Sequence, residues 1–491
     1  MATGIPRTRL NNNVSKHRVK AACNDNALGV RLEYKGKRPE DEILSTSPPA
    51  RVQTLWPQGG AYNVKSPNRL YFGENLSILA ALLRDGSVKG KVRLIYIDPP
   101  FATRMVYQSR SLSDAYTDLI AGSHYVEFLR ERLILLRELL ADDGSIYVHL
   151  DENMAFHIKL IMDEVFGLKN YRNWITRKKC NPKNYTRRTF GNVCDFILFY
   201  TKSENYIWSR PLERWTPERV AKEYQYVEKS TGRRYKKVPI HAPGVRNGQT
   251  GKAWRGQNPP SGKHWQFPPK TLEEMDKRGE IYWSPSGNPR RKVYLDDSDG
   301  IPIQDLWLDC RDAHNQNIRI TGYPTEKNPD MLTRIIEASS NPGDLVLDCF
   351  SGSGTTLAVA SALGRYWIGI DSSPEAIATT LKRFAIGTER MGDFVTKRRG
   401  EEVNNEEKPL SLLDLMEGTE REQPAATQKT LISDFSLCTS VSSPVELEAA
   451  LSAWREQVGS VDSVKEAPGR YKKANRRNHR KPSKQMSSAV K

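Results

Sequence analysis

The sequence predicts an α/β fold built on a mostly parallel, doubly wound sheet with helices on both faces. From Arg69 onward, short apolar runs alternate with amphipathic helical stretches, and this alternation is typical of parallel strands joined by crossover helices. Acidic residues directly follow several of the apolar runs, and a glycine-rich loop separates one run from the next helix. The carboxyl ends of parallel strands are where such sheets bind ligands.

Each expected element follows from its local pattern. The amphipathic stretch 125–140 repeats apolar residues at helical spacing, and Asp142-Asp143-Gly144 after it indicates a turn. Ser372 and Glu375 form a capping box around Pro374 at the start of the last of these helices. We expect strands at 70–72, 93–97, 145–150, 196–201, 345–347 and 366–370, and helices at 76–83, 125–140, 154–166, 329–338, 355–363 and from Pro374 towards Phe384.

Changes in composition divide the chain into five parts. The α/β pattern occupies two of them, and a section rich in Trp, Tyr, Lys and Arg, with broken periodicity, separates these two. Both ends are polar, apart from a short helix candidate at 444–458. The parts are a flexible arm (1–50), the first α/β half (51–204), the basic insert (205–320), the second α/β half (321–392) and a largely disordered basic tail (393–491).

Charge and cysteine usage limit the class of protein. The 491 residues carry a formal net charge of +17, which suits a nucleic-acid partner because basic groups near phosphates release counterions; a merely soluble basic protein is the alternative. The six cysteines form no Cys-x-x-Cys pair, as expected of a reduced, cytoplasmic protein. No apolar run long enough to span a membrane and no signal-peptide pattern are apparent.

The first chemical motif is Asp98-Pro99-Pro100-Phe101, at the end of an expected strand. Consecutive prolines make the backbone stiff. The Asp98 carboxylate and the Pro99 carbonyl can accept hydrogen bonds from an exocyclic amine, while Phe101 can stack on the ring of a base. A strand that merely ends in a Pro-Pro turn is the structural alternative.

The second motif runs from Asp348 to Thr356 and includes Phe350, Gly352 and Gly354. It follows a strand and opens a helix, so that a ligand can approach the backbone closely and meet free N–H groups. Asp371 ends the next strand, where a carboxylate can receive ribose hydroxyls. The order strand, glycine loop, helix, strand and acid indicates an adenosyl cofactor.

Together the two motifs resemble the beta class of DNA amino-methyltransferases, in which the catalytic motif precedes the cofactor motif. The resemblance covers about residues 69–384 and extends to the modification subunits of type III restriction systems. Three departures are Ala102-Thr103-Arg104 after the catalytic aromatic residue, Glu326-Lys327-Asn328 in place of Gln-Lys-Pro, and Cys349-Phe350 in place of Pro-Phe. Further matching segments are Gly73-Glu74-Asn75, 144–151, 322–327 and 339–344.

The resemblance implies a Rossmann-like class I methyltransferase that uses S-adenosyl-L-methionine. Its catalytic residues would be those of the acid-proline-proline-aromatic motif, and the target base would be flipped out of double-stranded DNA. The insert at 205–320 lies where this family keeps its target-recognition region. The residues implied in cofactor binding are Asp348, Phe350, Gly352, Gly354 and Asp371, with Thr325, Lys327 and Thr356 as candidates for the cofactor's carboxylate.

Within the family that the chain resembles, Asp98 favours adenine N6 as the target, since relatives that methylate N4 of cytosine commonly have serine at this position; N4 of cytosine is the alternative. The chain contains no Pro-Cys pair, which argues against a cytosine C5 enzyme with a cysteine nucleophile. An inactive DNA-binding relative, and an enzyme that methylates RNA or a protein glutamine amide, are rival interpretations. A homodimer and a separate restriction subunit are the further partners considered, and no membrane partner is expected. His149 and Asp151 are interpreted as structural.

Overall fold

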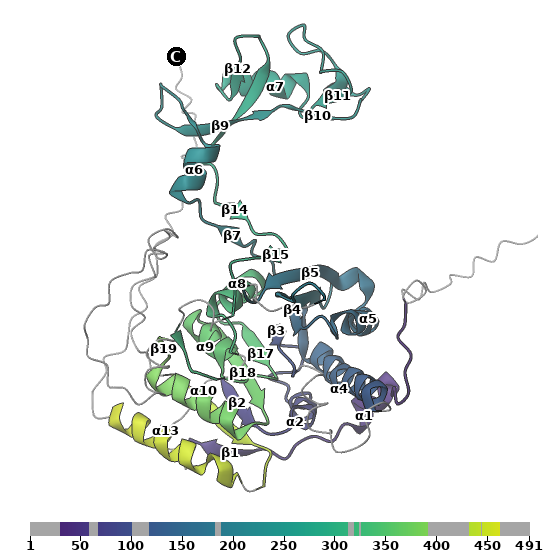
Figure 1. Cartoon of the computed structure of the whole chain (residues 1–491), viewed down its shortest axis with the longest axis vertical. Helices are drawn as coiled ribbons and strands as arrows, with labels where there is room; N and C mark the ends of the chain where they lie inside the picture. Colours follow the sequence, from purple (N-terminus) through teal and green to yellow (C-terminus); the bar gives the residue numbers. More distant parts are fainter. Residues whose placement is uncertain are drawn as a thin grey trace, which may run out of the picture.

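The computed structural model of the chain describes residues 30–57, 67–100, 117–181, 188–312, 319–323, 326–390, 432–442 and 444–461. A ten-stranded sheet forms the centre of the body in Figure 1. Across the sheet the strands are β1 (Gln53–Trp56), β20 (Ser436–Thr439), β2 (Arg69–Phe72), β18 (Tyr366–Asp371), β17 (Leu345–Asp348), β3 (Val92–Ile97), β4 (Leu140–Leu150), β6 (Cys194–Thr201), β5 (Tyr171–Lys178) and β15 (Leu306–Trp307).

Helices pack on both faces of this sheet, so the doubly wound prediction is confirmed. Successive residues of a strand point to opposite faces, and accordingly Ile95 of β3 belongs to one apolar core and Leu94 to the other. The helices of the first core are α1 (Glu40–Thr46), α2 (Asn75–Leu82), α4 (Thr117–Leu139) and α5 (Ala155–Phe166), and those of the second are α8 (Pro329–Ser339), α9 (Thr355–Ala362), α10 (Pro374–Ile386) and α13 (Glu448–Val461).

The strands in the middle of the sheet are parallel. Among them lies the position where the crossover connections begin to lead towards opposite edges of the sheet. Neighbouring strands from β20 through β2, β18, β17 and β3 to β4 all run the same way. From β3 the chain crosses through α4 to β4, whereas from β17 it crosses through α9 to β18 on the other side. Since β17 and β3 are paired, with Leu347 beside Ile95, their carboxyl ends meet where the two crossovers diverge. Sheets of this type bind ligands there.

β4 begins earlier than the sequence predicted. Its register against β3 shifts between Val92 and Leu94, so the segment Asp142-Asp143-Gly144 bulges from the ladder and does not form the expected turn. A side chain on Gly144 would lie 2.8 Å from Cγ of Leu140. The turn prediction is wrong because the pairing with β3 continues on both sides of this segment.

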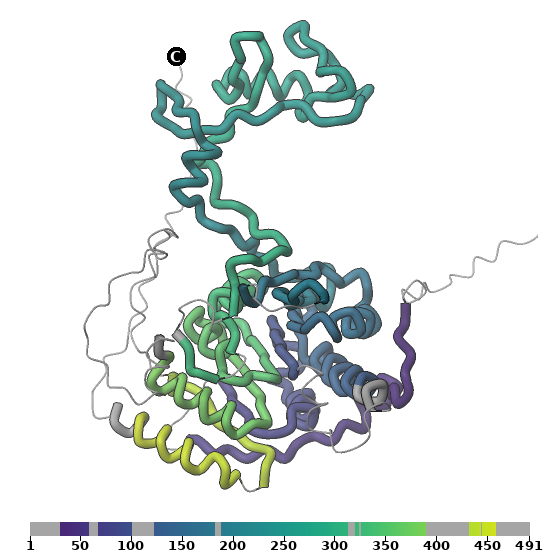
Figure 2. Tube along the Cα trace, in the orientation of Figure 1, coloured from purple at the N-terminus to yellow at the C-terminus, as the bar shows by residue number. Residues whose placement is uncertain are grey.

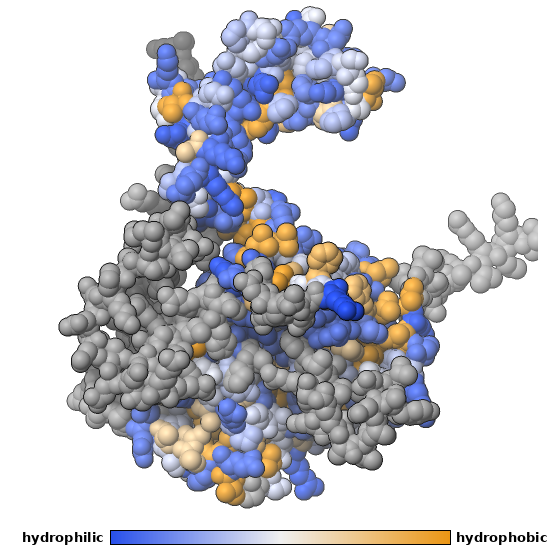
Figure 3. All heavy atoms as spheres, viewed as in Figure 1, coloured by the Kyte–Doolittle hydropathy of each residue, from blue (hydrophilic) through white to orange (hydrophobic). Residues whose placement is uncertain are grey.

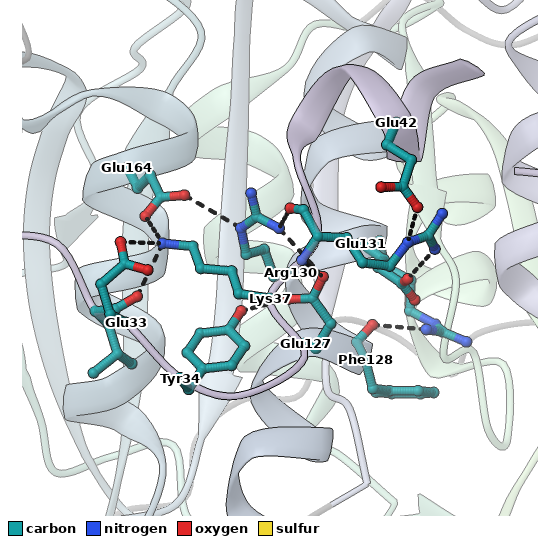
Figure 4. Close-up of polar contacts among 12 residues, drawn as sticks. Glu33, Tyr34, Lys37, Glu42, Glu127, Phe128, Arg130, Glu131 and Glu164 are labelled. Carbon is teal, nitrogen blue, oxygen red and sulfur yellow. Dashed lines mark hydrogen bonds and ion pairs between the residues drawn. The ribbon is translucent and has the colours of Figure 1, made fainter. Parts of the chain in front are cut away.

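The N-terminal segment packs against α4, and the flexible arm predicted for residues 1–50 is wrong for residues 30–50. Ile43 of α1 is completely buried. Figure 4 shows polar contacts between this segment and helices α4 and α5, among them the ion pair of Lys37 with Glu164 at 2.7 Å. These partners lie far along the chain, so local sequence composition did not reveal them.

The C-terminal part also contributes to the sheet: residues 432–442 and 444–461 pack on the body, and the rest of the tail predicted at 393–491 lies outside the described residues. β20 lies between β1 and β2. The helix expected at 444–458 corresponds to α13, which packs on α10. Its Trp454 is 1 % exposed and contacts the rings of Trp56 and Phe435, with centroids 5.6 and 5.3 Å away. β20 is only four residues long and too short to stand out in a polar stretch.

A separate lobe projects from the body, as Figures 1 and 2 show. The chain leaves through β7 (Leu212–Glu213) and returns through β14 (Ile301–Pro302), which pair antiparallel. The lobe has its own apolar core, which includes Trp254 and Trp265. Its other elements are α6 (Pro217–Glu223), β8 (Tyr226–Val227), β9 (Arg234–Pro239), β10 (His241–Pro243), β11 (Lys263–Trp265), α7 (Pro269–Lys277), β12 (Ile281–Trp283) and β13 (Pro289–Tyr294).

The lobe is shorter than the insert predicted at 205–320. β15 pairs with β5 of the central sheet, and β16 (Arg319–Ile320) pairs with β19 (Glu389–Arg390), so the chain has already rejoined the body before residue 320. Figure 3 shows mainly hydrophilic residues on the visible face of the lobe. Within the described ranges, no helix combines the length and the apolar character that crossing a membrane requires.

The packing of α13 predicts a measurable contribution to stability. Trp454→Ala removes a buried indole between two aromatic rings and should lower the free energy of unfolding by about 3–5 kcal/mol. Urea denaturation measures this change. Trp208→Ala is the control, since Trp208 is 47 % exposed, and it should cost less than half as much. Equal effects of the two substitutions would contradict the packing described for α13.

Candidate functional site

The two chemical motifs line one cavity of about 380 Å³. Asp98 follows the last residue of β3, and Asp348 is the last residue of β17. Paired strands lie about 4.8 Å apart, so the pairing of β17 with β3 brings the two acids side by side. Pro100 and Asp371 also line the cavity. The expectation that folding joins the motifs at one edge is confirmed, while Phe101 lies outside the described residues.

The loop that follows β17 lines the cavity. Gly352 and Gly354 have φ of +51° and +72°, a conformation that favours glycine. A side chain on Gly354 would lie 2.7 Å from Thr380. The ring of Phe350 lines the cavity and lies 6.1 Å from that of Phe128 in α4. The glycines thus suit the backbone conformation of the loop and its packing against α10, and close approach of a ligand to this backbone stays a prediction.

Asp348 is held at the bottom of the loop. Oγ1 of Thr356 donates to its Oδ2 at 2.6 Å, and the Phe350 N–H donates to its Oδ1 at 3.0 Å. Burial raises the pKa of Asp348 to about 7, against the effect of these hydrogen bonds, and the charges of Asp98 and Asp371 add to the rise. Thr356, predicted to meet a cofactor carboxylate, thus binds Asp348.

Asp371 ends β18 at the rim of the cavity. Its Oδ2 accepts the N–H of Gly352 at 2.8 Å, and its Oδ1 accepts the N–H of Ser373 at 2.9 Å. Burial raises the pKa of Asp371, while these backbone donors lower it. Each carboxylate oxygen has further acceptor capacity, so Asp371 can still receive hydroxyl groups from a ligand.

The two oxygens of Asp98 differ. Oδ2 lies 2.8 Å from Nζ of Lys327. Oδ1 is buried and has no hydrogen-bond partner among the described residues; Nδ1 of His149 lies 4.0 Å away. Lys327, predicted to meet a cofactor carboxylate, is instead paired with Asp98, and Thr325 lies outside the described residues. An unsatisfied buried acceptor in a cavity wall is suited to a ligand N–H donor.

Several groups at the cavity had no role assigned from the sequence. Arg132 of α4 donates from Nε to Oδ1 of Asn75 at 2.6 Å and forms an ion pair with Glu74. Asn75 in turn donates to the Cys349 carbonyl at 2.8 Å. Arg132 is four residues after Phe128, so it interrupts an otherwise apolar helical face. This arginine within an apolar helical face was the sequence feature that could have indicated a role at the cavity.

A buried charged cluster lies behind Asp98. His149 is completely buried, and its Nε2 lies 2.9 Å from Oδ2 of Asp195. Arg177 donates to both oxygens of Asp195 at 2.8 and 2.6 Å. Charged residues inside apolar strands were the sequence signal for this pair. Oδ1 of Asp151 accepts the N–H of Met154 at 3.2 Å.

Glu326, where relatives of the predicted family have glutamine, is balanced by a second charge. It is 3 % exposed and forms an ion pair with Arg383 of α10. Nε of Arg383 donates to the Ser353 carbonyl at 2.7 Å. The pair therefore ties the segment before α8 to the glycine loop, because a lone buried charge would be costly.

Many basic residues of the lobe are engaged within it. Arg233 pairs with Asp296 at 2.7 Å, and Arg255 pairs with Glu273 at 2.8 Å. Nζ of Lys237 lies 3.5 Å from the ring centroid of a tyrosine on β12. These basic side chains are thus partly engaged by acidic and aromatic groups of the lobe itself.

Comparison with known proteins gives consistent matches. The N6/N4 methyltransferase family, described as DNA methylase, matches residues 92–382. The chain is 46 % identical over 418 residues to the type II methyltransferase M.EcaI of Enterobacter cloacae, covering 84 % of this chain and 90 % of that protein. It is 28 % identical over 341 residues to the Mod subunit of the type III restriction-modification enzyme StyLTI of Salmonella typhimurium, covering 62 % and 51 %. The crystal structure of the M1.HpyAVI–SAM complex matches with 17 % identity and a TM-score of 0.35, over 64 % of this chain and 98 % of that one.

The raised pKa of Asp348 predicts a pH effect on stability. Its folded pKa of about 7 lies above the ordinary 3.8, so ionisation favours the unfolded chain, and this group reduces stability as the pH rises from about 4 to 7. Asp348→Asn removes that loss, and the stability of the variant relative to the unmodified protein should rise from pH 5 to about 7 and then level off. Urea denaturation at several pH values measures the difference.

Asp309→Asn serves as the control for this measurement. Partial desolvation of the Asp309 carboxyl raises its pKa, but Arg334 more than offsets that effect and lowers it. Asp309 is thus ionised in both folded and unfolded states across pH 5–8, and its variant should show a constant difference. A flat profile for Asp348→Asn as well would contradict the raised pKa.

Proposed function

The chain belongs to the N6/N4 family of DNA methylases, and from this premise we propose that it methylates adenine N6 in double-stranded DNA. The methyl donor is S-adenosylmethionine. One observation supports the target chemistry above others: Oδ1 of Asp98 is a buried acceptor without a partner among the described residues, in the cavity that also contains the glycine loop. An exocyclic amine supplies the N–H donor that this oxygen lacks.

The cavity suits the cofactor in size and charge. Its volume of about 380 Å³ lies within the range of small-molecule sites, and the carboxylates of Asp98, Asp348 and Asp371 line it. When bound, S-adenosylmethionine supplies the electrophilic methyl group on a positively charged sulfonium, which such carboxylates stabilise. We assign Asp371 to the ribose hydroxyls and the glycine loop to the methionine end.

We assign different roles to the three residues predicted to hold the cofactor's carboxylate. Thr356 and Lys327 already bind Asp348 and Asp98, and we assign them to orienting these acids. Lys327 also balances the charge of Asp98 in a cavity with several acids. Thr325 stays a prediction for the cofactor's carboxylate.

In the transfer, this chain orients the amine and stabilises charge. Oδ1 of Asp98 and the carbonyl of Pro99 accept the two N–H groups of the amine, which directs its lone pair towards the methyl carbon. Orientation of this kind, with acceptors placed for the developing positive charge, needs no covalent intermediate. The base has to leave the duplex to reach this cavity. Stacking on Phe101 stays a prediction.

The lobe between β7 and β14 is the part of the chain that we assign to target recognition. It projects from the body (Figure 1), and exposed basic side chains such as Arg234 and Arg290 lie on its paired strands. Arginine side chains can bind phosphates and guanine edges.

A homodimer and a separate restriction subunit remain predictions, and N4 of cytosine is the alternative target.

Analysis of the methylated product tests the proposed function. Purified protein, S-adenosylmethionine with a labelled methyl group and DNA of mixed sequence should yield labelled N6-methyladenine, measured by mass spectrometry of the digested nucleosides. Label on N4-methylcytosine alone would contradict the adenine assignment. Absence of any labelled base would contradict the enzymatic proposal.

Substitution of Asp98 tests its role in that reaction. Asp98→Ala removes the acceptor for the amine and should lower kcat by about 100-fold or more, while calorimetry should still detect cofactor binding. Asp142→Ala is the matched control, since Asp142 is exposed near the amino end of β4, and it should leave kcat unchanged. Full activity of Asp98→Ala would refute this assignment.

A further inference from the structure

Tyr96 and Asp98 both lie next to the imidazole of His149, whose Nδ1 is 2.8 Å from the Tyr96 hydroxyl and 4.0 Å from Oδ1 of Asp98. Tyr96 and Asp98 are two residues apart at the end of β3, so their side chains leave the same face of the strand, and both line the cavity. Burial raises the pKa of Tyr96 well above its ordinary value, and the charge of Asp98 adds to the rise. The hydroxyl therefore keeps its proton, which it can donate to one acceptor at a time.

The acceptor that Tyr96 uses is His149. The hydroxyl oxygen lies 2.8 Å from Nδ1 of the imidazole, while Nε2 lies 2.9 Å from Oδ2 of Asp195. Burial raises the pKa of Asp195, but the neighbouring His149 and Arg177 more than offset this effect and hold it well below its usual range. An ionised Asp195 can only accept, so in the neutral imidazole Nε2, which lies beside it, carries the proton and Nδ1 accepts that of Tyr96.

We infer that His149 is a positioning residue for methyl transfer: it accepts the Tyr96 proton and so keeps that hydroxyl from occupying Oδ1 of Asp98. The inference rests on the proposed function, in which Oδ1 receives the target amine. His149 does not touch the amine; it acts through Tyr96. Asp195 determines which imidazole nitrogen is the acceptor, and Arg177 holds Asp195 in place by donating to both of its carboxylate oxygens.

The state of Asp98 supports this role. Buried acceptors in proteins nearly always have a hydrogen-bond partner, yet Oδ1 of Asp98 has none among the described residues. Lys327 binds only the other oxygen, Oδ2. With a tyrosine hydroxyl on the same face of the strand, the vacant acceptor persists because that hydroxyl is bound elsewhere. His149 therefore preserves the acceptor that the incoming amine requires.

A double substitution separates this role from a merely structural one. His149→Leu frees the Tyr96 hydroxyl to bind Asp98 and should lower single-turnover methyl transfer by about tenfold or more, with unchanged cofactor affinity. Combining it with Tyr96→Phe should restore the rate to that of Tyr96→Phe alone, because no hydroxyl then needs to be diverted. If the two losses add instead, the inference is overturned.

Tyr147→Phe is the matched control for the restored rate. Tyr147 is a buried tyrosine on β4 whose hydroxyl lies 2.7 Å from Oγ of Ser339, away from the cavity. Combined with His149→Leu, it should restore nothing. Recovery by Tyr147→Phe would show that the loss of any buried hydroxyl suffices, and would overturn the inference.

A second experiment leaves the imidazole of His149 in place. Asp195→Asn presents an amide N–H to Nε2, which reverses the imidazole tautomer and should also lower the rate by about tenfold or more. In the unmodified protein, ¹⁵N NMR of His149 should show protonated Nε2 and unprotonated Nδ1; protonated Nδ1 would overturn the inference. The product assay and Asp98→Ala test the proposed function separately, so either claim can fail alone.

Discussion

Parallel pairing of β17 with β3 is the constraint on which the rest of the site depends. Each strand is an apolar run that ends in, or is followed at once by, an acid, and the pairing of Leu347 with Ile95 fixes the two acids at neighbouring positions on one edge. The chain crosses from these strands in opposite directions, so no connecting helix covers that edge. Residues far apart in sequence therefore line one cavity, and neither motif could serve the proposed reaction alone.

Burying several acids at one edge has an electrostatic consequence. Asp348 responds with a raised pKa, whereas Asp98 and Asp195 are balanced by Lys327 and Arg177. Such pairs seldom add much stability, because removing two charges from water offsets their attraction. These ion pairs instead orient the site, since they determine which oxygen of Asp98 and which nitrogen of His149 can accept a further hydrogen bond. A site of this charge suits a cationic methyl donor.

Much of the fold could be predicted from the sequence because its strands and helices carry strong local patterns. The positions of Asp98, Asp348 and Asp371 followed from the ends of apolar runs, which become one edge of a parallel sheet. The bulge in β4 and the short strand β20 were missed, since each depends on pairing with a distant strand. The pairing of Lys327 with Asp98, and the position of Asp195 beside His149, were missed for the same reason: no local pattern indicates which charges meet in the folded chain.

The most direct test is a crystal structure of the protein with double-stranded DNA and a non-reactive analogue of S-adenosylmethionine. The account predicts a flipped adenine whose N6 lies within hydrogen-bond distance of Oδ1 of Asp98, about 3 Å, with the analogue in the same cavity beside the glycine loop. A base or an analogue bound away from this cavity, or a Tyr96 hydroxyl bonded to Oδ1, would contradict it.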